Sequence, residues 1–297
     1  MSAGDTAAGS AALEVLAPGM LALVQDLGRP GWAHVGVGRS GAADQGSMRL
    51  ANRLVANPES AAGIELLLGG LRLRARGAVT VALAGAEGPA TVDGRPVGRD
   101  ALVEVPDGGE LVVGTATRGL RTYVAVRGGL AVPAVLGSRS TDRLAGLGPA
   151  PLVVGDVLLV GPPPAELPTV DLAPVRPWPD EVVVPVVPGP HVDWFTDGLA
   201  VLTGHEGYRT TPASDRTALR LDGRAIARTP DARGRELPPI GLVPGAVQIP
   251  PNGLPVVFGA DHPVTGGYPV LAVVRSSAQG ALAQLRPGDR LRFTLTR

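Results

Sequence analysis

The sequence predicts a mainly β protein that consists of two β-rich domains with a few short helices. The 297 residues include 42 Gly and 30 Pro, which divide the chain into many short apolar runs. Several runs, such as Leu71–Arg74, alternate apolar and charged residues with the period of a half-exposed strand. A proline-rich segment over 162–180 separates two such stretches. We therefore expect domains at 13–161 and 181–297, joined by this linker and preceded by a disordered leader over 1–12.

The N-terminal domain begins with strand-like runs and contains the clearest amphipathic helix of its half. A turn-rich stretch, Gly28–Gly31, follows the first runs. Asp44–Val55 has the apolar spacing of a helix that Asp44 can cap, and Asn57 and Pro58 end it. The strands expected in this domain are Leu13–Leu16, Leu21–Gln25, Leu71–Arg74, Val79–Ala84, Leu102–Val105, Leu111–Gly114 and Tyr123–Val126.

The C-terminal domain repeats this style. Its expected strands are Glu181–Val187, Val256–Phe258 and Val270–Val274, and its expected helical segments are Val192–Leu202 and Ser276–Leu285. A Gly-Asp pair precedes the last strand of each half, at Asp156 and again at Asp289. This repeat of the Gly-Asp pair is a weak signal, but together with the linker it favours two β-rich domains.

The composition excludes several kinds of chemistry. The Lys+Arg count of 27 consists entirely of Arg, and the chain has no Cys. A Schiff-base lysine, a P-loop lysine, a biotin attachment site, a thiol nucleophile and a disulfide are therefore ruled out on these residues. The net charge is zero and no apolar run is long enough to span a bilayer. We expect a cytoplasmic protein that binds neither nucleic acid nor membrane.

Two familiar site patterns do not hold in this sequence. Gly36–Gly41 spells G-x-G-x-x-G, but the preceding stretch is turn-rich and the later strands do not alternate with helices, as a dinucleotide site requires. The four histidines, His34, His191, His205 and His262, are too far apart in sequence to form a helical metal-binding pair. No metal site is expected.

Polar residues placed among glycines and prolines are the best candidates for chemistry, because the backbone there is fixed and side chains can be aimed. They provide guanidinium, carboxylate, amide and imidazole groups, which suffice to bind an anion and move a proton. An arginine fork suits a small acidic or amide substrate. The catalytic candidates are Asp44, Asp215, Asp261 and His34. The candidates for substrate or anion binding are Arg29, Ser40, Gly41, Arg216, Gln248, Asn252, Thr265, Gly266, Gly267 and Tyr268.

These clusters, in this order, carry a family resemblance. The pieces are Val24–Gly31, Arg39–Ala42, Leu50–Val55, Val135–Thr141, Pro188–Pro190, Asp193–Phe195, Ser214–Arg216, Pro244–Pro251, Thr265–Pro269 and Gln284–Asp289. The chain resembles the family of the 5-oxoprolinase C subunit, also called allophanate hydrolase subunit 2. It is similar to part of the biotin-dependent carboxyltransferase domain of urea amidolyase, and to a sporulation protein that antagonises a histidine-kinase inhibitor. The resemblance covers roughly Leu13 to Phe293.

The resemblance implies two cyclophilin-like β-barrel domains and a heteromeric enzyme. The implied partners are a smaller, cyclophilin-like B subunit and a third subunit. The implied reaction is ATP-driven hydrolysis of 5-oxo-L-proline to L-glutamate by the complex, and the question of which subunit binds ATP stays open. Alternatives are an allophanate hydrolase or biotin-dependent carboxyltransferase subunit, and a regulatory protein that binds a kinase inhibitor.

The chain departs from the family pattern near its C-terminal motifs. The family often has Gln-Thr-Thr before Gly-Gly-Tyr-Pro and Lys after it, whereas this chain has Pro263, Val264 and Thr265 before it and Val270 after it. Many members also continue Ser-Asp-Arg with Met-Gly, where this chain has Thr-Ala. The lost polar groups weaken the case for carboxyl transfer. Because the chain has no lysine, arginines must bind any anionic group, and Arg29 and Arg216 are the first candidates.

Overall fold

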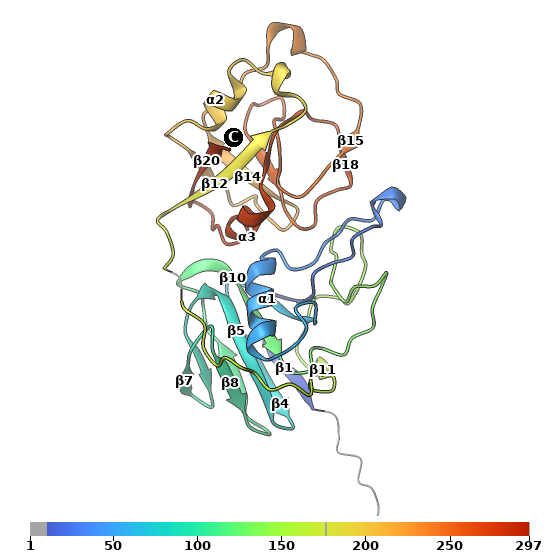
Figure 1. Cartoon of the computed structure of the whole chain (residues 1–297), viewed down its shortest axis with the longest axis vertical. Coiled ribbons are helices and arrows are strands. Elements are labelled where there is room, and N and C mark those ends of the chain that lie inside the picture. Colours follow the sequence, from blue (N-terminus) through green and yellow to red (C-terminus); the bar gives the residue numbers. More distant parts are fainter. Residues whose placement is uncertain (1–10, 176, 297) are drawn as a thin grey trace, which may run out of the picture. The chain divides into compact units, whose positions relative to one another are not determined.

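A computed structural model describes residues 11–175 and 177–296 and divides them into two compact units (Figure 1). The first unit contains the described residues up to 27 together with 47–135 and 149–175. The second contains 28–46, 136–148 and the described residues from 177 onward. Both units are built mainly of strands and the helices are short, so the predicted fold class is confirmed.

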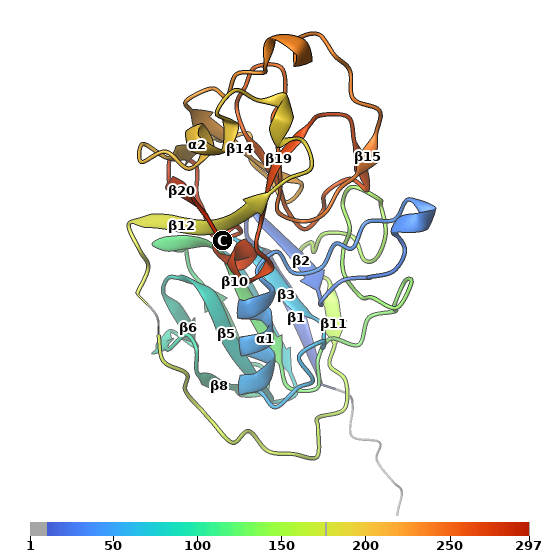
Figure 2. The ribbon, with the colours of Figure 1, turned by 45° about the horizontal axis from the view of Figure 1, so that its top comes forward.

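The first unit consists of two antiparallel sheets. One has the order β11-β1-β4-β9-β6-β7 and the other the order β2-β3-β10-β5-β8. Figure 2 shows β1 and β11 side by side at the edge of the first sheet, with Leu13 opposite Leu158. The strands are β1 (Ala12–Pro18), β2 (Leu21–Gln25), β3 (Gly63–Leu67), β4 (Leu71–Arg76), β5 (Val79–Glu87), β6 (Ala90–Val92), β7 (Arg95–Val97), β8 (Leu102–Val105), β9 (Glu110–Val113), β10 (Arg118–Val126) and β11 (Val157–Leu159).

Alternation along these strands builds the core of the first unit. In β4 every second residue is buried, so Leu71 and Leu73 join a cluster that also contains Val15 and Val81, while the arginines between them are exposed. The leader predicted over 1–12 falls on residues 1–10, which lie outside the described part, and on Ala12, which already begins β1.

The predicted amphipathic helix is α1, Gln45–Leu54. Its apolar face buries Ala51 and Leu54 against Ala82 and Ala125 of β5 and β10. The arginines of the opposite face pair with one glutamate, and Arg53 Nη1 lies 2.7 Å from Glu59 Oε1. The periodicity of 3.6 residues thus located the helix within one residue at each end.

The second unit contains a closed barrel with the strand order β12-β19-β16-β17-β14-β13-β20. A parallel pair between β12 and β20 completes the circle, with Val184 opposite Phe293. The strands are β12 (Glu181–Pro188), β13 (Tyr208–Thr210), β14 (Ala218–Gly223), β16 (Ala246–Gln248), β17 (Val256–Phe258), β19 (Val270–Val274) and β20 (Arg290–Leu295), with a separate ribbon of β15 (Ile240–Gly241) and β18 (Thr265–Gly266).

Short helical turns cover the barrel, whose interior holds Val184, Leu221, Val247 and Phe293 among other buried side chains. The segments predicted as helical over 192–202 and 276–285 each contain a 3-10 turn followed by a short α-helix. The helices not yet given are η1 (Ala33–Val35), η2 (Val192–Trp194), α2 (Gly198–Leu202), η3 (Pro230–Ala232), η4 (Ser276–Ala278) and α3 (Gln279–Leu282).

The two units differ from the contiguous domains expected at 13–161 and 181–297. Residues 28–46 and 136–148 belong to the same unit as the C-terminal barrel, and Ser40 and Gly41 bond to Asp261 and Arg216 of that unit. Between β11 and β12 no helix or strand forms in the described residues. Part of this segment is nevertheless held along the chain beside β8, where Leu102 N donates to Asp171 O at 2.8 Å.

The repeated Gly-Asp pair corresponds to the same turn in both units. Asp156 Oδ2 accepts from Val153 N at 2.8 Å, and Asp289 Oδ2 accepts from Arg286 N at 2.8 Å. Each turn precedes the last strand of its unit, β11 or β20. The repeat therefore reports a local turn that feeds a terminal strand, in two units whose sheets are arranged differently.

Candidate functional site

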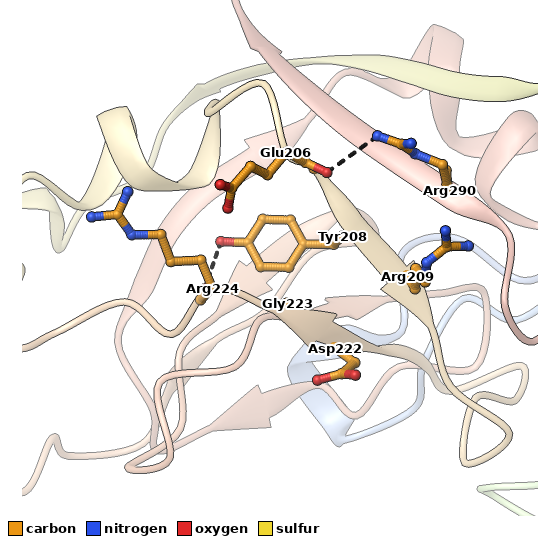
Figure 3. Close-up of a pocket in the computed structure, with 8 residues that line it drawn as sticks. Glu206, Tyr208, Arg209, Asp222, Gly223, Arg224 and Arg290 are labelled. Atoms are coloured by element: carbon orange, nitrogen blue, oxygen red, sulfur yellow. Dashed lines mark hydrogen bonds between the residues drawn. The ribbon is translucent and has the colours of Figure 1, made fainter.

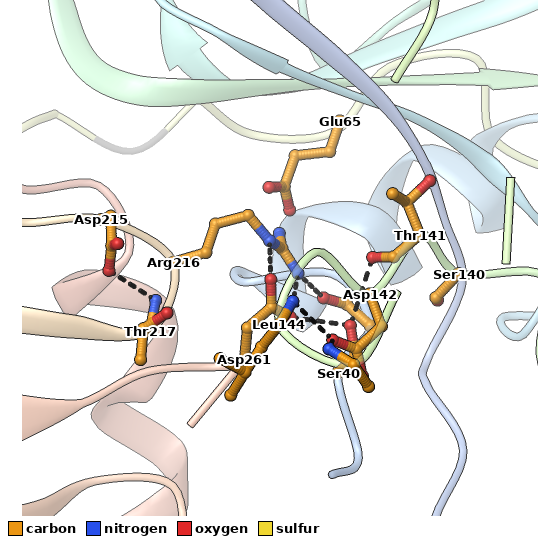
Figure 4. Close-up of polar contacts among 12 residues, drawn as sticks. Ser40, Glu65, Ser140, Thr141, Asp142, Leu144, Asp215, Arg216, Thr217 and Asp261 are labelled. Atoms are coloured by element: carbon orange, nitrogen blue, oxygen red, sulfur yellow. Dashed lines mark hydrogen bonds and ion pairs between the residues drawn. The ribbon is translucent and has the colours of Figure 1, made fainter. Parts of the chain in front are cut away.

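A buried ion pair between Arg216 and Asp261 lies at the centre of the polar network in the second unit (Figure 4). Arg216 Nε donates to Asp261 Oδ2 at 2.7 Å, and Nη2 donates to Oδ1 at 2.9 Å. Both residues are less than a tenth exposed. The guanidinium therefore grips the carboxylate with two parallel hydrogen bonds, the strongest geometry for this pair.

The pair also binds the loop that carries Ser40 and Gly41. Ser40 Oγ donates to Asp261 Oδ1 at 2.7 Å, and Arg216 Nη2 donates to Gly41 O at 2.6 Å. Ser40 Oγ also lies 3.3 Å from Thr141 O, but its single proton favours the shorter bond to the charged carboxylate. Ser40 has a φ of 51°, a left-handed conformation that costs a non-glycine residue free energy. The ion pair thus holds a strained residue in place.

Glycine makes this loop possible by letting its two ends meet. Arg29 N donates to Arg39 O at 2.8 Å, which closes the loop at its base. Gly28 has a φ of 84°, and a Cβ there would lie 2.5 Å from Arg39 O. The G-x-G-x-x-G pattern at Gly36–Gly41 is part of this closed loop and follows η1 instead of a strand, so it does not have the setting of a dinucleotide site.

A second loop is attached to the first through Arg29. The Arg29 side chain is fully buried; its Nη2 donates to Ser140 O, and its Nη1 lies 3.4 Å from Asp142 Oδ2. Asp142 Oδ1 in turn accepts from Leu144 N and Ala145 N at 3.0 and 2.9 Å. Arg29 thus joins the loops 28–46 and 136–148, and its role in binding substrate anions stays a prediction.

Asp44 lies in a separate buried contact with the C-terminal helical segment. Its Oδ2 accepts from Gln284 Nε2 at 2.9 Å. Gly280 of α3 packs directly on this carboxylate, because a Cβ at that glycine would come 2.6 Å from Asp44 Oδ1. Asp44 immediately precedes α1, so the contact attaches the end of loop 28–46 to the segment around α3.

In two histidines a hydrogen bond from Nδ1 to a backbone carbonyl leaves Nε2 as the nitrogen that can accept a proton. His262 is buried, and its Nδ1 lies 2.8 Å from Pro263 O; His34 is exposed, and its Nδ1 lies 2.9 Å from Gly31 O. A carbonyl oxygen only accepts, so Nδ1 carries the proton and the neutral ring has its lone pair on Nε2. His262 follows Asp261 directly in sequence, and this candidate base was not among the predicted site residues.

The remaining predicted residues do not join the network. Asp215 is exposed, and its Oδ1 accepts from Thr217 N and Ala218 N in a turn before β14. Gln248 Nε2 donates to Tyr268 O at 2.8 Å and so supports the loop after β18. The other members of the set are Asn252, which accepts from Leu254 N, Thr265 and Gly266, which form β18, and Gly267, which follows that strand.

The geometry favours a positioning role for the ion pair. Both oxygens of Asp261 already accept hydrogen bonds from Arg216, and Oδ1 accepts a further bond from Ser40. The Asp261 carboxylate thus holds three donor groups, Arg216 Nε, Arg216 Nη2 and Ser40 Oγ, in fixed positions. Its role as a base stays a prediction, and so do the roles of Asp44, Asp215 and His34. Sequence reasoning missed Asp142, Gln284 and His262 as site residues, although Gln284 lies within a family motif.

A shallow cavity of 370 Å³ lies at the other end of β14 (Figure 3). Arg216 precedes β14, whereas Asp222 and Gly223 at its end line the cavity, so about 20 Å of strand separates the two. Tyr208 lies against it and donates from its hydroxyl to Arg224 O at 3.0 Å. Burial raises the pKa of Tyr208 to about 12, and the charge of Arg224 opposes this rise. None of the predicted site residues lines this cavity.

Two kinds of feature are absent from the part of the chain that the structure describes. Within residues 11–175 and 177–296, no three His, Cys, Asp or Glu side chains are grouped so that they could hold a metal ion. No helix in the same ranges combines the length and the apolar character needed to cross a bilayer.

The family model "Carboxyltransferase domain, subdomain A and B" matches residues 35–295. The chain belongs to this family. The match includes Ser40, Arg216 and Asp261, and it spans residues of both units.

Named relatives fall into two groups. The chain is 33% identical to the 5-oxoprolinase C subunit of Escherichia coli (strain K12), over 95% of this chain and 90% of that protein. It is 32% identical to urea amidolyase of Lachancea kluyveri, over 95% of this chain and 17% of that protein. The crystal structure of the K. lactis urea amidolyase matches with a TM-score of 0.89 and 30% identity, over 96% of this chain and 19% of that one. The first group matches at nearly full length, and the second contains this fold as one part of a larger protein.

Proposed function

We propose that this chain is one subunit of an ATP-dependent complex that hydrolyses 5-oxo-L-proline to L-glutamate. The observation that carries the proposal is the match to the 5-oxoprolinase C subunit, which covers 95% of this chain and 90% of the relative. A match along nearly the whole length of both chains favours a shared role for the whole subunit. The chain covers under a fifth of the urea amidolyases, which are therefore much longer proteins than this chain.

The reaction needs ATP because an unactivated lactam resists water. Transfer of a phosphoryl group to the lactam oxygen forms an O–P bond, releases ADP and makes the ring carbon a better electrophile. Addition of water and cleavage of the C–N bond, whose nitrogen takes a proton, then leave an acyl phosphate. A second water hydrolyses it to glutamate and phosphate. Such a sequence needs a positioned base and donors for developing negative charge.

This chain's own residues supply a rigid setting for that chemistry. The pair of Arg216 and Asp261 fixes the Ser40–Gly41 segment, and His262 beside it has a lone pair on Nε2 in its neutral form. We assign Arg216 and Asp261 to positioning and His262 to proton transfer. ATP is a substrate of the proposed complex, and which subunit binds it stays open. The partners proposed are a smaller, B-type subunit and a third subunit.

Reconstitution tests the proposal. The purified chain is mixed with both partner subunits, and glutamate release and ADP formation are followed with 5-oxo-L-proline as substrate. We expect glutamate only when all subunits and ATP are present, and equimolar ADP. His262→Gln should lower kcat by about 100-fold or more with little change in the assembly of the complex. His191→Gln, in the same unit but bonded to the backbone of β19, is the matched control and should keep near-normal activity. Folded subunits that assemble but release no glutamate contradict the proposal.

A second candidate, carboxyl transfer in an allophanate or urea pathway, is favoured by the family model and by the urea amidolyase relatives. It requires biotin, which these 297 residues cannot carry because they contain no lysine. Biotin would therefore be attached to another chain. Carboxylation activity that avidin abolishes in a mixture with a biotinylated partner would favour this candidate over lactam hydrolysis. ATP-dependent glutamate release unaffected by avidin would exclude biotin from the reaction.

A further inference from the structure

Two arginines converge on one buried tryptophan in the second unit. Trp194, in η2, is 7% exposed. The guanidinium carbon of Arg235 lies 4.6 Å from the centre of the indole ring, and that of Arg228 lies 5.8 Å from it. Both distances are within the range of a cation–π contact. Two positively charged side chains therefore contact the same indole ring.

The local backbone fixes this arrangement. Thr229 N donates to Trp194 O at 3.0 Å, and Phe195 pairs with Arg228 in an antiparallel bridge. His191 packs its ring edge-on to Trp194 with centroids 5.9 Å apart. The tryptophan and the base of the arginine loop are therefore held before any ligand arrives, which lowers the entropy lost on binding.

Neither positive charge forms an ion pair in the part of the chain that the structure describes. Among the described residues, no carboxylate oxygen lies within 4.0 Å of a guanidinium nitrogen of Arg228 or Arg235. Arg228 Nη1 donates to Arg235 O at 3.2 Å, which brings the two residues together without neutralising either. Both guanidinium groups lie within 6 Å of the centre of the same indole ring, so an anion that reaches this ring is attracted by two positive charges.

One donor of the cluster is unsatisfied. Arg228 Nε is buried and has no hydrogen-bond partner, which costs about 1–3 kcal/mol for such a group. The Arg228 side chain is held by its bond to Arg235 O and by its contact with the indole. Rotation of this guanidinium toward an acceptor would recover part of that cost, and a ligand oxygen is the acceptor that its surroundings lack.

We propose that Arg228 and Arg235, stacked on Trp194, form a binding site for a phosphate group. Two guanidinium charges match a dianion better than a single carboxylate, and each planar fork can donate two hydrogen bonds to phosphate oxygens. The site uses none of the residues of the Arg216 and Asp261 network. It therefore stands independently of the reaction proposed above.

The test uses the indole as a reporter. The chain has three tryptophans, and Trp32→Phe together with Trp178→Phe leaves Trp194 as the sole source of indole fluorescence. This variant is titrated with inorganic phosphate, with acetate and with chloride at constant ionic strength, and calorimetry of the unchanged chain with phosphate provides a second measurement. We expect a saturable response to phosphate and a response at least about tenfold weaker to acetate.

Charge-removing variants locate the site. Arg235→Gln should weaken phosphate binding by about tenfold or more, since it deletes a charge-assisted contact. Arg233→Gln is the matched control, because Arg233 is exposed in the same loop and does not stack on the indole, and it should bind within about twofold of the parent. Arg228→Gln is informative only if circular dichroism shows a folded barrel, and otherwise Arg235→Gln decides alone. Equal responses to phosphate and chloride, equal affinity for acetate, or unchanged binding in Arg235→Gln would each overturn the proposal.

Discussion

Arg216 and Asp261 are joined by two hydrogen bonds of 2.7 and 2.9 Å although 45 positions separate them in the sequence. The pair binds Ser40 and Gly41 from a loop 175 positions away from Arg216. Removal of one partner of a buried ion pair lowers the free energy of unfolding strongly, because the remaining charge is poorly solvated. This relationship makes the loop 28–46 part of the barrel unit and sets the first prediction.

Asp261→Asn should destabilise the chain by about 3–5 kcal/mol, because it removes the negative charge that the buried Arg216 guanidinium binds with two hydrogen bonds. Urea unfolding followed by circular dichroism measures the change. Glu59→Gln is the comparison, since its pair with Arg53 is exposed and should contribute less than about 1 kcal/mol. A loss below about 1 kcal/mol for Asp261→Asn would show that the buried pair contributes little.

Substitution of Ser40 by Ala and by Gly should change the stability of the chain by different amounts. Ser40→Ala loses the hydrogen bond to Asp261 and keeps the left-handed backbone strain, whereas Ser40→Gly loses the bond but relieves the strain. We expect both to be less stable than the parent, with the glycine variant more stable than the alanine variant by about 1 kcal/mol. Midpoints of urea unfolding test the order, and an alanine variant as stable as the glycine variant would argue against a strained Ser40.

Gly28→Ala should be more harmful than Gly31→Ala. Both glycines have positive φ values, 84° and 95°, so both substitutions carry a similar backbone cost. The Cβ at Gly28 would also collide with Arg39 O at 2.5 Å, whereas nothing lies within 4 Å of a Cβ at Gly31. We expect Gly28→Ala to lower the unfolding midpoint clearly further, and equal midpoints would mean that the loop closes differently.

Tyr208 should titrate late at alkaline pH. Burial raises its pKa to about 12, so the folded state holds the phenol proton after the unfolded state has lost it. The unfolded state then binds fewer protons, and stability falls as pH rises from about 10 to about 12. Near-ultraviolet absorbance of the phenolate, compared with that of Tyr208→Phe, isolates this group. The variant should lose the late phase and part of the alkaline fall in stability, and an unchanged titration would contradict the assignment.

The sequence by itself determined the elements that depend on neighbouring residues. The alternation of Leu71–Arg74 located β4, the periodicity after Asp44 located α1, and the prolines of 162–180 predicted the absence of helices and strands that the described part of that segment shows. These features follow from backbone sterics and from which face of an element is apolar, and both act over a few residues. The candidate residues predicted from sequence likewise include Arg29, Ser40, Arg216 and Asp261.

Only the tertiary structure decided what those residues contact. It paired Arg216 with Asp261, used Arg29 to join two loops, and left Asp215 in an exposed turn, although all four are charged residues set among turns. Arg29 and Asp142 lie 113 positions apart, and no local pattern records which acid a given arginine will meet. Long-range packing brings such groups together and excludes water from them, and burial with a specific partner gives a charge its role.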